Sequence, residues 1–383
     1  MSVTAAKGFT AAGIAAGIKE NGNPDLALVV NNGPRRAAAG VFTVNRVKAA
    51  PVLWSEQVLK SGQLAAVVLN SGGANACTGP KGFQDTHATA EKAAEVLGVG
   101  AGEVAVCSTG LIGVLLPMDK LLPGVGTAAA QLSEHGGEKA ALAIKTTDTV
   151  HKTSVAGKDG WTVGGMAKGA GMLAPGLATM LVVLTTDADL GTETLDKALR
   201  AATKVTFDRV DSDGCMSTND TVLLLASGAS GVTPAYDDFA EAVRQVCDDL
   251  GQQLIRDAEG ASKDIKVEVV NAATEDDAVE VGRSIARNNL LKCAVHGEDP
   301  NWGRVLSAIG TTKAAFEPDR LNVAINGVWV CKNGGVGEDR DKVDMRYREV
   351  HIVADLSAGD ATATIWTNDL TADYVHENSA YSS

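Results

Sequence analysis

Several short patterns that mark metal, redox and nucleic-acid sites are missing from this 383-residue sequence. Its six cysteines form no CxxC pair and its six histidines form no HExxH motif, which disfavours a thiol redox site and any histidine-built metal site. No cluster of five Lys or Arg residues occurs, and 47 acidic residues outnumber 34 basic ones, for a net charge of −13. Because nucleic-acid phosphates need a basic surface, we expect no nucleic-acid partner.

Long apolar runs are also missing. The longest, such as residues 180–184 and 222–226, have the length of a strand and fall far short of the roughly 20 residues that a membrane helix needs. The first 20 residues do not form an export signal, because Lys7, Lys19 and Glu20 interrupt the apolar positions. We therefore expect a cytoplasmic protein with no membrane partner, in which scattered thiols stay reduced.

The composition that remains is that of a globular protein, with 45% hydrophobic residues and 4% aromatic ones. At roughly 150 residues per domain, the length corresponds to two or three domain equivalents or to one large layered domain. Short β-rich runs are predicted to be strands. They cover residues 26–30, 64–69, 104–107, 180–185, 221–226, 265–270, 323–325, 350–353 and 363–366.

Helical patterns lie between some of these strands. The clearest has apolar residues at steps of three and four, namely Phe239, Val243, Val246, Leu250 and Leu254, which form one face of a long helix. Residues 85–97, 192–203 and 276–288 are predicted to be further helices. Strands and helices are mixed without strict alternation, so the predicted fold class is α/β in the mixed, α+β sense.

Five glycines and a proline crowd the stretch Gly164–Ala178, which we expect to be tight and exposed. Residues 169–174 fit the GxGxxA dinucleotide template, but Pro175 and Gly176 break the helix that this template requires. The phosphate-binding pattern GxxxxGK and the nucleophile pattern GxSxG do not occur. The glycine-rich stretch therefore predicts neither a nucleotide site nor a serine hydrolase.

Thr179 stands at the junction between this stretch and an apolar strand. An N-terminal threonine can act as a nucleophile because its own α-amine, with a pKa of about 7.7–8.0, serves as the base. Exposing that amine would require cleavage between Ala178 and Thr179, which the Thr179 hydroxyl could carry out by attacking the Ala178 carbonyl. Taken locally, however, Thr179 is better explained as a β-branched residue that starts a strand.

The chain resembles the ornithine acetyltransferase, or glutamate N-acetyltransferase, family of arginine biosynthesis. The resemblance runs from end to end, and it is carried by segments that occur in the family's order. They are LNSGGANACTG at 69–79, CSTGLIG at 107–113, TTDT at 146–149, WTVGGMAKGAGMLAPGLATMLVVLTTDA at 161–188, FDRVDSDGCMSTNDT at 207–221, RDAEGASK at 256–263, HGEDPNWGR at 296–304 and ENSAYSS at 377–383.

This resemblance implies a self-processing enzyme with stacked β-sheets flanked by helices, related to self-processing N-terminal-nucleophile hydrolases. Cleavage between Ala178 and Thr179 would give an α chain, residues 1–178, and a β chain, residues 179–383, which form one intertwined catalytic unit. The chains would assemble as α2β2. Thr179 would carry an acetyl group from N2-acetyl-L-ornithine to L-glutamate in a ping-pong reaction. No cofactor is required, and use of acetyl-CoA as a second acetyl donor is left open.

The family's site residues map onto individual positions here. Thr109 and Gly110 correspond to the oxyanion hole, which stabilises the tetrahedral intermediate. Substrate contacts correspond to Thr146, Lys168, Thr179, Glu259, Asn378 and Ser383. Lys168 suits a carboxylate, and its charge would lower the pKa of a neighbouring α-amine. Glu259 suits the δ-ammonium of ornithine. Reasoning from the residues does not separate Thr146 from Thr147, and many members end in threonine where this chain has Ser383.

Two segments have less certain roles, and two other functions remain open. The aspartates of residues 207–220, Asp208, Asp211, Asp213 and Asp220, lack the spacing of a calcium loop, so we interpret them as hydrogen-bonding residues of the site floor. Residues 70–75 are interpreted as a turn near the pocket. An amidohydrolase or aminopeptidase with the same threonine would give the acyl group to water instead. A non-catalytic binding protein would keep its chain uncut.

Overall fold

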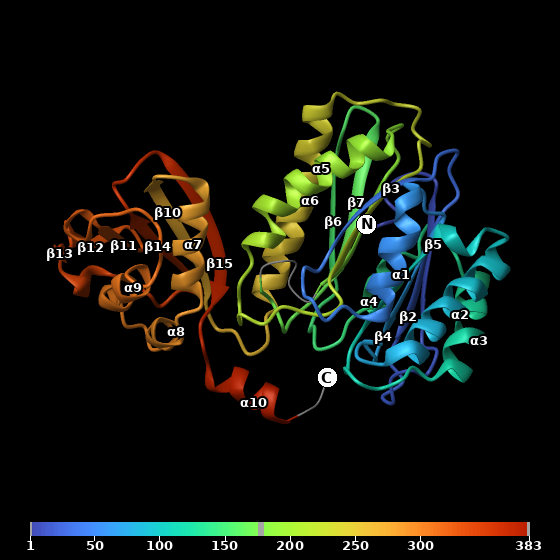
Figure 1. Ribbon diagram of the computed structural model, residues 1–383, viewed down its shortest axis with the longest axis horizontal. Helices are drawn as coiled ribbons and strands as arrows, with labels where there is room; N and C mark the ends of the chain where they lie inside the picture. Colours follow the sequence, from blue (N-terminus) through green and yellow to red (C-terminus); the bar gives the residue numbers. More distant parts are fainter. Residues whose placement is uncertain (1, 175–179, 381–383) are drawn as a thin grey trace.

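The computed structural model describes residues 2–174 and 180–380, so Ala178, Thr179 and Ser383 lie outside the described residues. Its strands form a larger lobe with two sheets and a smaller lobe with one (Figure 1). In the larger lobe, the four-stranded sheet contains β1 (Phe9–Ile14), β2 (Leu26–Asn31), β4 (Ala66–Ser71) and β5 (Val104–Thr109) in that order. The five-stranded sheet contains β3 (Ala37–Phe42), β9 (Thr221–Ala226), β8 (Leu181–Thr186), β7 (Trp161–Lys168) and β6 (Lys152–Lys158) in that order.

The two sheets of the larger lobe pack face to face between layers of helices. Alternate residues of β8 divide between two cores: Leu181 and Val183 pack towards the four-stranded sheet, whereas Val182 and Leu184 pack towards α5 and α6. Because both faces of β8 are buried, apolar and polar residues do not alternate along its sequence. The helices of this lobe are α1 (Ala50–Val58), α2 (Gly79–Leu97), α3 (Met118–Ala130), α4 (Gly137–Ala143), α5 (Thr192–Val205) and α6 (Tyr236–Arg256).

Strands from both sides of the predicted cleavage point pair with one another. β8 pairs antiparallel with β7, which precedes that point, and parallel with β9, which follows it. β9 in turn pairs antiparallel with β3 from the N-terminal part of the chain. The backbone hydrogen bonds of one sheet therefore join residues 37–168 to residues 181–226.

The smaller lobe has its own sheet and core. The sheet contains β13 (Gly335–Val336), β12 (Val328–Lys332), β11 (Asn322–Ile325), β14 (Glu349–Asp355), β10 (Asp264–Ala272) and β15 (Ala361–Asn368) in that order. Three helices belong to this lobe, α7 (Glu275–Ala286), α8 (Asn289–His296) and α9 (Trp302–Ile309). After β15 the chain enters α10 (Ala372–Ala380), which leaves the smaller lobe and extends towards the larger one (Figure 1).

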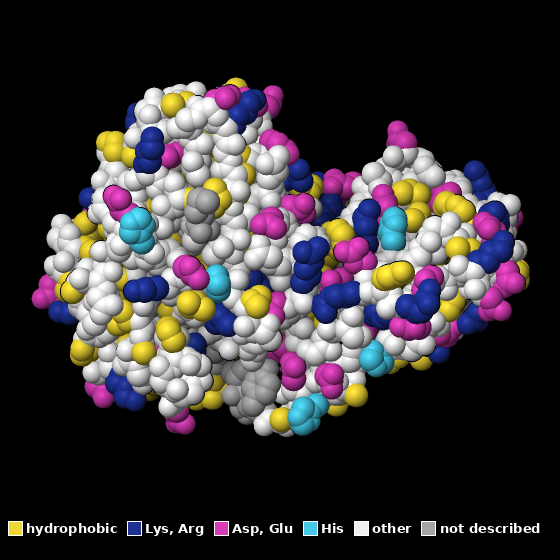
Figure 2. Space-filling model, turned by 180° about the vertical axis from the view of Figure 1, so that it is seen from behind, with side chains coloured by type: hydrophobic (Ala, Val, Ile, Leu, Met, Phe, Trp, Pro, Cys, Tyr) yellow, Lys and Arg dark blue, Asp and Glu magenta, His cyan; other side chains and the backbone are white. Residues whose placement is uncertain are grey.

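The predicted fold class is confirmed: the molecule is mixed α/β, with stacked sheets and outer helices. Each strand and helix predicted from the sequence is present, with its ends shifted by a few residues; α2 begins earlier, at Gly79. The surface in Figure 2 carries Lys and Arg interspersed with Asp and Glu, not a single basic stripe. Among the residues that the structure describes, no helix is both long and apolar enough to cross a membrane.

The expectation that the glycine-rich stretch is exposed is wrong for its first part. Gly164–Lys168 belong to β7 and are buried. The glycines are needed for close packing, because a Cβ on Gly164 would lie 2.3 Å from the carbonyl oxygen of Ser2. A Cβ on Gly165 would lie 2.8 Å from Cδ2 of Leu184. Here glycine marks a crowded strand and not a turn.

We expect Gly164→Ala to lower the free energy of unfolding by about 2 kcal/mol, because the added methyl group overlaps a backbone oxygen that cannot move aside. Gly126→Ala is a suitable control, since nothing lies within 4 Å of the Cβ it would add and the residue is inside α3. That change should raise stability by about 0.5–1 kcal/mol. Denaturant melts of both variants check this, and equal midpoints would contradict the packing argument.

Candidate active site

One pocket of about 560 Å³ contains the predicted site residues that lie within the described part of the chain. They are Thr109, Gly110, Thr146, Lys168, Glu259 and Asn378. They come from the ends of β5 and β7, the segment after α4, the turn after α6, and α10. Thr147 lines the same pocket, so its lining does not distinguish Thr146 from Thr147. Thr179 and Ser383, together with the cleavage position at Ala178, fall outside the described residues.

Thr109 and Gly110 meet the pocket where β5 ends. Thr109 is the last residue of that strand and is buried. Gly110 has a φ of +129°, and a Cβ there would lie 2.6 Å from the backbone nitrogen of Gly73, so only glycine fits. The Nζ of Lys168 donates a hydrogen bond of 3.3 Å to Oγ1 of Thr109. Because that oxygen accepts from a cation, its own O–H is polarised and becomes a better donor.

Lys168 is a buried cation at the end of β7, with 2% of its surface exposed. Burial lowers its pKa, and the charge of Lys152 acts in the same direction. Asp148, Glu259 and Asp220 oppose this shift. The charge of Lys168 therefore depends on the carboxylates around the pocket.

The carboxylate of Asp148 holds together two segments that line the pocket. Its Oδ1 accepts hydrogen bonds of 2.6 Å from Lys152 Nζ and from the backbone N–H of Gly169. Its Oδ2 accepts one of 3.0 Å from the backbone N–H of Thr146. Burial acts to raise the pKa of Asp148, but the charges of Lys168 and Lys152 and these hydrogen bonds outweigh it and bring the pKa below its ordinary value.

Lys152 extends this network to the segment that carries Glu259. Its side chain is fully buried, and its Nζ donates 2.5 Å to Oδ2 of Asp257 as well as to Asp148. Asp257 also accepts from the backbone N–H and the hydroxyl of Thr149. A buried ammonium between two carboxylates is compensated only while both partners remain.

Glu259 follows α6 in a turn that packs against the glycine-rich segment. Its backbone N–H donates 3.0 Å to the carbonyl of Ala170. A Cβ on Gly171 would lie 2.6 Å from Oε2 of Glu259, so the absence of a side chain at this glycine allows the close approach of the carboxylate. Burial of Glu259 is nearly complete, with 9% of the residue exposed.

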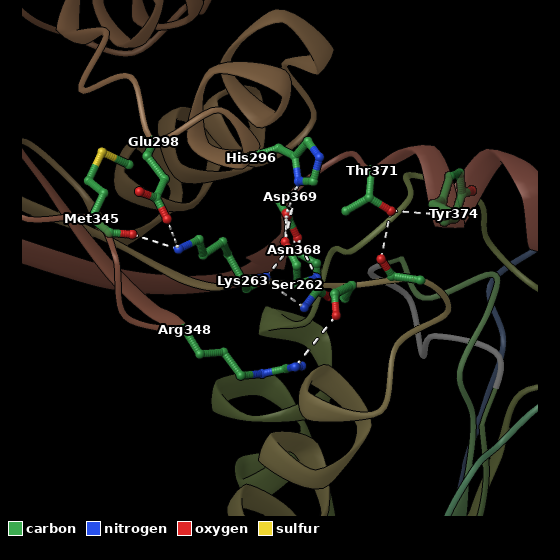
Figure 3. A network of polar contacts seen from close by, with 12 residues as sticks. Ser262, Lys263, His296, Glu298, Met345, Arg348, Asn368, Asp369, Thr371 and Tyr374 are labelled. Carbon is green, nitrogen blue, oxygen red and sulfur yellow. Dashed lines mark hydrogen bonds and ion pairs between the residues drawn. The ribbon is translucent and has the colours of Figure 1, made fainter.

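A polar network fixes α10, and with it Asn378, against the same turn (Figure 3). The Thr371 hydroxyl donates 2.6 Å to the carbonyl of Gly260 and accepts 2.9 Å from the backbone N–H of Tyr374. Asp369 accepts from the backbone N–H groups of Ser262 and Lys263 and from Nδ1 of His296. The segment between the lobes and the segment entering α10 are thus joined directly beside Glu259.

Sequence reasoning missed residues that line the pocket and residues that support its lining through hydrogen bonds. Asp148 and Lys152 were not singled out, although TTDT was one of the family motifs. Ser217, Thr218 and Asn219 line the pocket, whereas the four aspartates of the same segment, interpreted as its floor, are not among the lining residues. Asp211 and Asp213 do accept hydrogen bonds, from Arg287 and from the Cys215 backbone. Residues 70–75 end β4 beside the pocket, where Ala74 is a lining residue.

A buried lysine beside hydroxyl and amide donors suits the transfer of an acyl group, which places the molecule among α/β enzymes of the acyltransferase class. Comparison with known proteins gives the family: a model described as the ArgJ family matches residues 10–383. The chain belongs to the ArgJ family, and the resemblance drawn from its motifs is confirmed. Among the described residues, no group of three or more His, Cys, Asp or Glu side chains is arranged to hold a metal ion.

Individual relatives cover the whole chain. It is 91% identical over 383 residues to the arginine biosynthesis bifunctional protein ArgJ of Streptomyces coelicolor, with all of both chains aligned. The ArgJ protein of Thermobifida fusca is 64% identical over 382 residues, again with 100% of both covered. A crystal structure of ArgJ from Bacillus halodurans is 35% identical with a TM-score of 0.50, and the match covers 52% of this chain and 98% of that one. A structure of ornithine acetyltransferase complexed with ornithine, from Mycobacterium tuberculosis, is 62% identical with a TM-score of 0.45 over 47% of this chain and 96% of that one.

We expect Asp148→Asn to destabilise the protein by about 3 kcal/mol, because it leaves the buried Lys152 with one carboxylate fewer. The variant should also lose activity, since Lys168 and the Thr146 segment lose a shared partner. As the pKa of Asp148 is lowered on folding, its contribution is present above about pH 4 and disappears as the pH falls further. The stability difference from wild type should therefore shrink in acid.

Asp238→Asn provides the matched control for this change. Asp238 pairs with Lys158 at 3.0 Å, but both side chains are about half exposed, so its removal should leave stability and activity nearly unchanged. Thermal melts between pH 3 and 7 with acetyl-transfer assays measure both effects. If Asp148→Asn is as stable and active as Asp238→Asn, the hydrogen-bond network of Asp148 does not support the site.

Proposed function

We propose that this chain is an ornithine acetyltransferase that moves the acetyl group of N2-acetyl-L-ornithine to L-glutamate, through an acetyl-Thr179 intermediate. Ornithine leaves after the first half of the reaction, and N-acetylglutamate leaves after the second. The observation that carries this proposal is the convergence of Thr109, Gly110, Lys168 and Glu259 on one pocket in a member of the ArgJ family. Among the described lining residues, Lys168 is a cation and Glu259 an anion, which suits substrates that are themselves amino acids.

Self-cleavage generates the nucleophile in this proposal. The Thr179 hydroxyl attacks the Ala178 carbonyl carbon, the C–N bond breaks, and the proton passes to the nitrogen, leaving an ester. Water then hydrolyses the ester to give the Ala178 carboxylate, a free Thr179 hydroxyl and a free α-amine. The solved Bacillus halodurans chain supports this step, because nearly all of it matches about half of the present chain, as expected for one part of a cut protein.

The same groups would then serve acetyl transfer. The α-amine of Thr179 removes the hydroxyl proton as Oγ1 attacks the acetyl carbon, and the proton is delivered to the departing ornithine amine. Thr109 and Gly110 donate to the developing oxyanion, and each such donor lowers the activation free energy by about 3 kcal/mol. Lys168 polarises the Thr109 hydroxyl and, as a cation, disfavours protonation of the nearby amine. Glu259 binds the δ-ammonium of the donor.

The proposal also includes the wider features that the family resemblance implies. The α chain, residues 1–178, and the β chain, residues 179–383, remain together in an α2β2 assembly in the cytoplasm, and no metal or other cofactor takes part. Retention of both chains is supported by the sheet that joins β7 to β8. The curated relatives are called bifunctional, and we extend the proposal to acetyl-CoA as a second acetyl donor. The transfer assay run with acetyl-CoA in place of N-acetylornithine measures that activity.

Thr179→Ala should leave a folded but uncut and inactive chain, because both cleavage and transfer need its hydroxyl. Thr179→Ser retains a hydroxyl and should be cut and turn over slowly. Intact mass of the purified proteins, followed by a product assay with N-acetylornithine and glutamate, checks both. Recovery of two chains from Thr179→Ala would refute self-cleavage. Acetate in place of N-acetylglutamate from the wild type would identify a hydrolase.

Glu259→Gln should raise the KM for N-acetylornithine by about tenfold, because the donor's ammonium loses a charged partner. The KM for glutamate should change little, since its side-chain carboxylate gains nothing from an anion. Glu377→Gln is the control: Glu377 lines the neighbouring surface cavity but not this pocket. Equal increases in KM for both substrates would show that Glu259 does not recognise the donor specifically.

A further inference from the structure

Asp220 is a buried carboxyl group that the proposed reaction does not use. It immediately precedes β9 and has no exposed surface. Its Oδ1 accepts a hydrogen bond of 3.1 Å from the backbone N–H of Met180. Its Oδ2 has no hydrogen-bond partner among the residues that the structure describes. A buried polar atom without a partner is costly, so its retention calls for an explanation.

The strands on either side fix Asp220 in place. β8 and β9 are parallel neighbours that begin in register, with Leu181 opposite Thr221. The Thr221 N–H donates 3.1 Å to the Met180 carbonyl, and the Thr43 N–H donates 3.0 Å to the Asp220 carbonyl. The carboxyl group therefore holds the entry of β8 through its backbone. The nitrogen that it contacts is the one bonded to the carbonyl carbon of Thr179.

The surroundings favour the neutral form of this carboxyl group. Burial raises the pKa of Asp220 well above its ordinary value, and this outweighs the hydrogen bond from the Met180 N–H and the charge of Lys168. Among the described residues, the titratable groups that face it are Lys168 from β7 and Cys215 from the segment before β9. An ionised carboxylate here would leave a buried negative charge with one described hydrogen bond, whereas the neutral acid has no charge to compensate.

We propose that Asp220 is a positioning residue for Thr179, holding the peptide bond that follows the nucleophile so that its hydroxyl is aligned for cleavage and for acetyl transfer. The inference rests on the proposed function, since it assigns Asp220 to the reactions of Thr179. Attack on a carbonyl requires the reacting atoms at about 3–3.5 Å in a fixed orientation, and misplacement by about 1 Å can cost a hundredfold in rate. Asp220 supplies a side-chain constraint one residue from the reacting group.

Two substitutions at Asp220 test whether its role needs a neutral hydrogen-bond acceptor or an ionised carboxylate. Asp220→Asn keeps an oxygen acceptor without a charge, whereas Asp220→Leu keeps the branching at Cγ without an acceptor. Asp187→Leu is the matched control, because Asp187 is also buried, accepts backbone N–H bonds from Lys7 and Thr162, and follows the other end of β8. For each protein, self-cleavage is followed by intact mass, acetyl transfer by its kcat, and folding by thermal melting.

We expect Asp220→Asn to cleave and turn over at nearly the wild-type rate, and Asp220→Leu to be at least about tenfold slower in both reactions. Asp187→Leu should lose thermal stability without slowing either reaction. The wild type should lose activity relative to Asp220→Asn as the pH rises through the raised pKa of Asp220, because the carboxyl group then ionises. If Asp220→Leu does not fold, the pH profiles of wild type and Asp220→Asn test the positioning role instead.

The outcomes against the inference are distinct from those against the function. If the wild-type chain is cut and Asp220→Leu reacts at the wild-type rate, the positioning role is overturned but the proposed function is not. An Asp220→Asn variant as slow as Asp220→Leu would show that an ionised carboxylate is required, which also overturns it. Parallel pH profiles for wild type and Asp220→Asn would do the same. A wild-type chain that stays uncut would overturn the proposed function, and the inference with it.

Discussion

The pocket depends above all on the buried carboxylate of Asp148. It accepts hydrogen bonds from Lys152, from the Gly169 backbone and from the Thr146 backbone, and its charge opposes the loss of the Lys168 proton. Thr146 and Gly169, the residue after Lys168, lie on different segments, and Asp148 accepts a hydrogen bond from the backbone N–H of each. Because Lys152 also contacts Asp257, the constraint continues to the turn that carries Glu259. The cation and the anion of the pocket are therefore held by one network.

A cut at residue 178 is compatible with this fold because the sheet does not depend on the connection there. β8 is held by β7 on one side and by β9 on the other, and side chains on both of its faces are buried. Backbone hydrogen bonds and apolar packing would both persist after cleavage, so the two products have no route to separate without breaking the core. Asp220 adds a side-chain hydrogen bond to the entry of β8, where a new chain end would lie.

Sequence patterns predicted some parts of the structure well and others poorly. Apolar strands such as residues 221–226 and the α6 periodicity were clear, because burial on a regular face leaves a regular pattern. β7 was missed, since its glycines resemble a turn but serve the packing against Ser2 and Leu184. The site residues were identified from motifs that occur in the family's order, and the six that the structure describes line one pocket. Asp148 and Lys152 act through buried pairing, which no local spacing reveals.

The balance of charge in the pocket explains why these buried groups occur together. Burial favours the neutral form of Lys168, and a neutral lysine would polarise the Thr109 hydroxyl less. Asp148 supplies a compensating charge, whereas burial favours the neutral form of Asp220, which faces the same lysine. An ionised Asp220 would add a further negative charge beside Lys168 and would oppose a developing oxyanion. The raised pKa of Asp220 therefore leaves the charge of Lys168 less compensated beside Thr109, where negative charge develops.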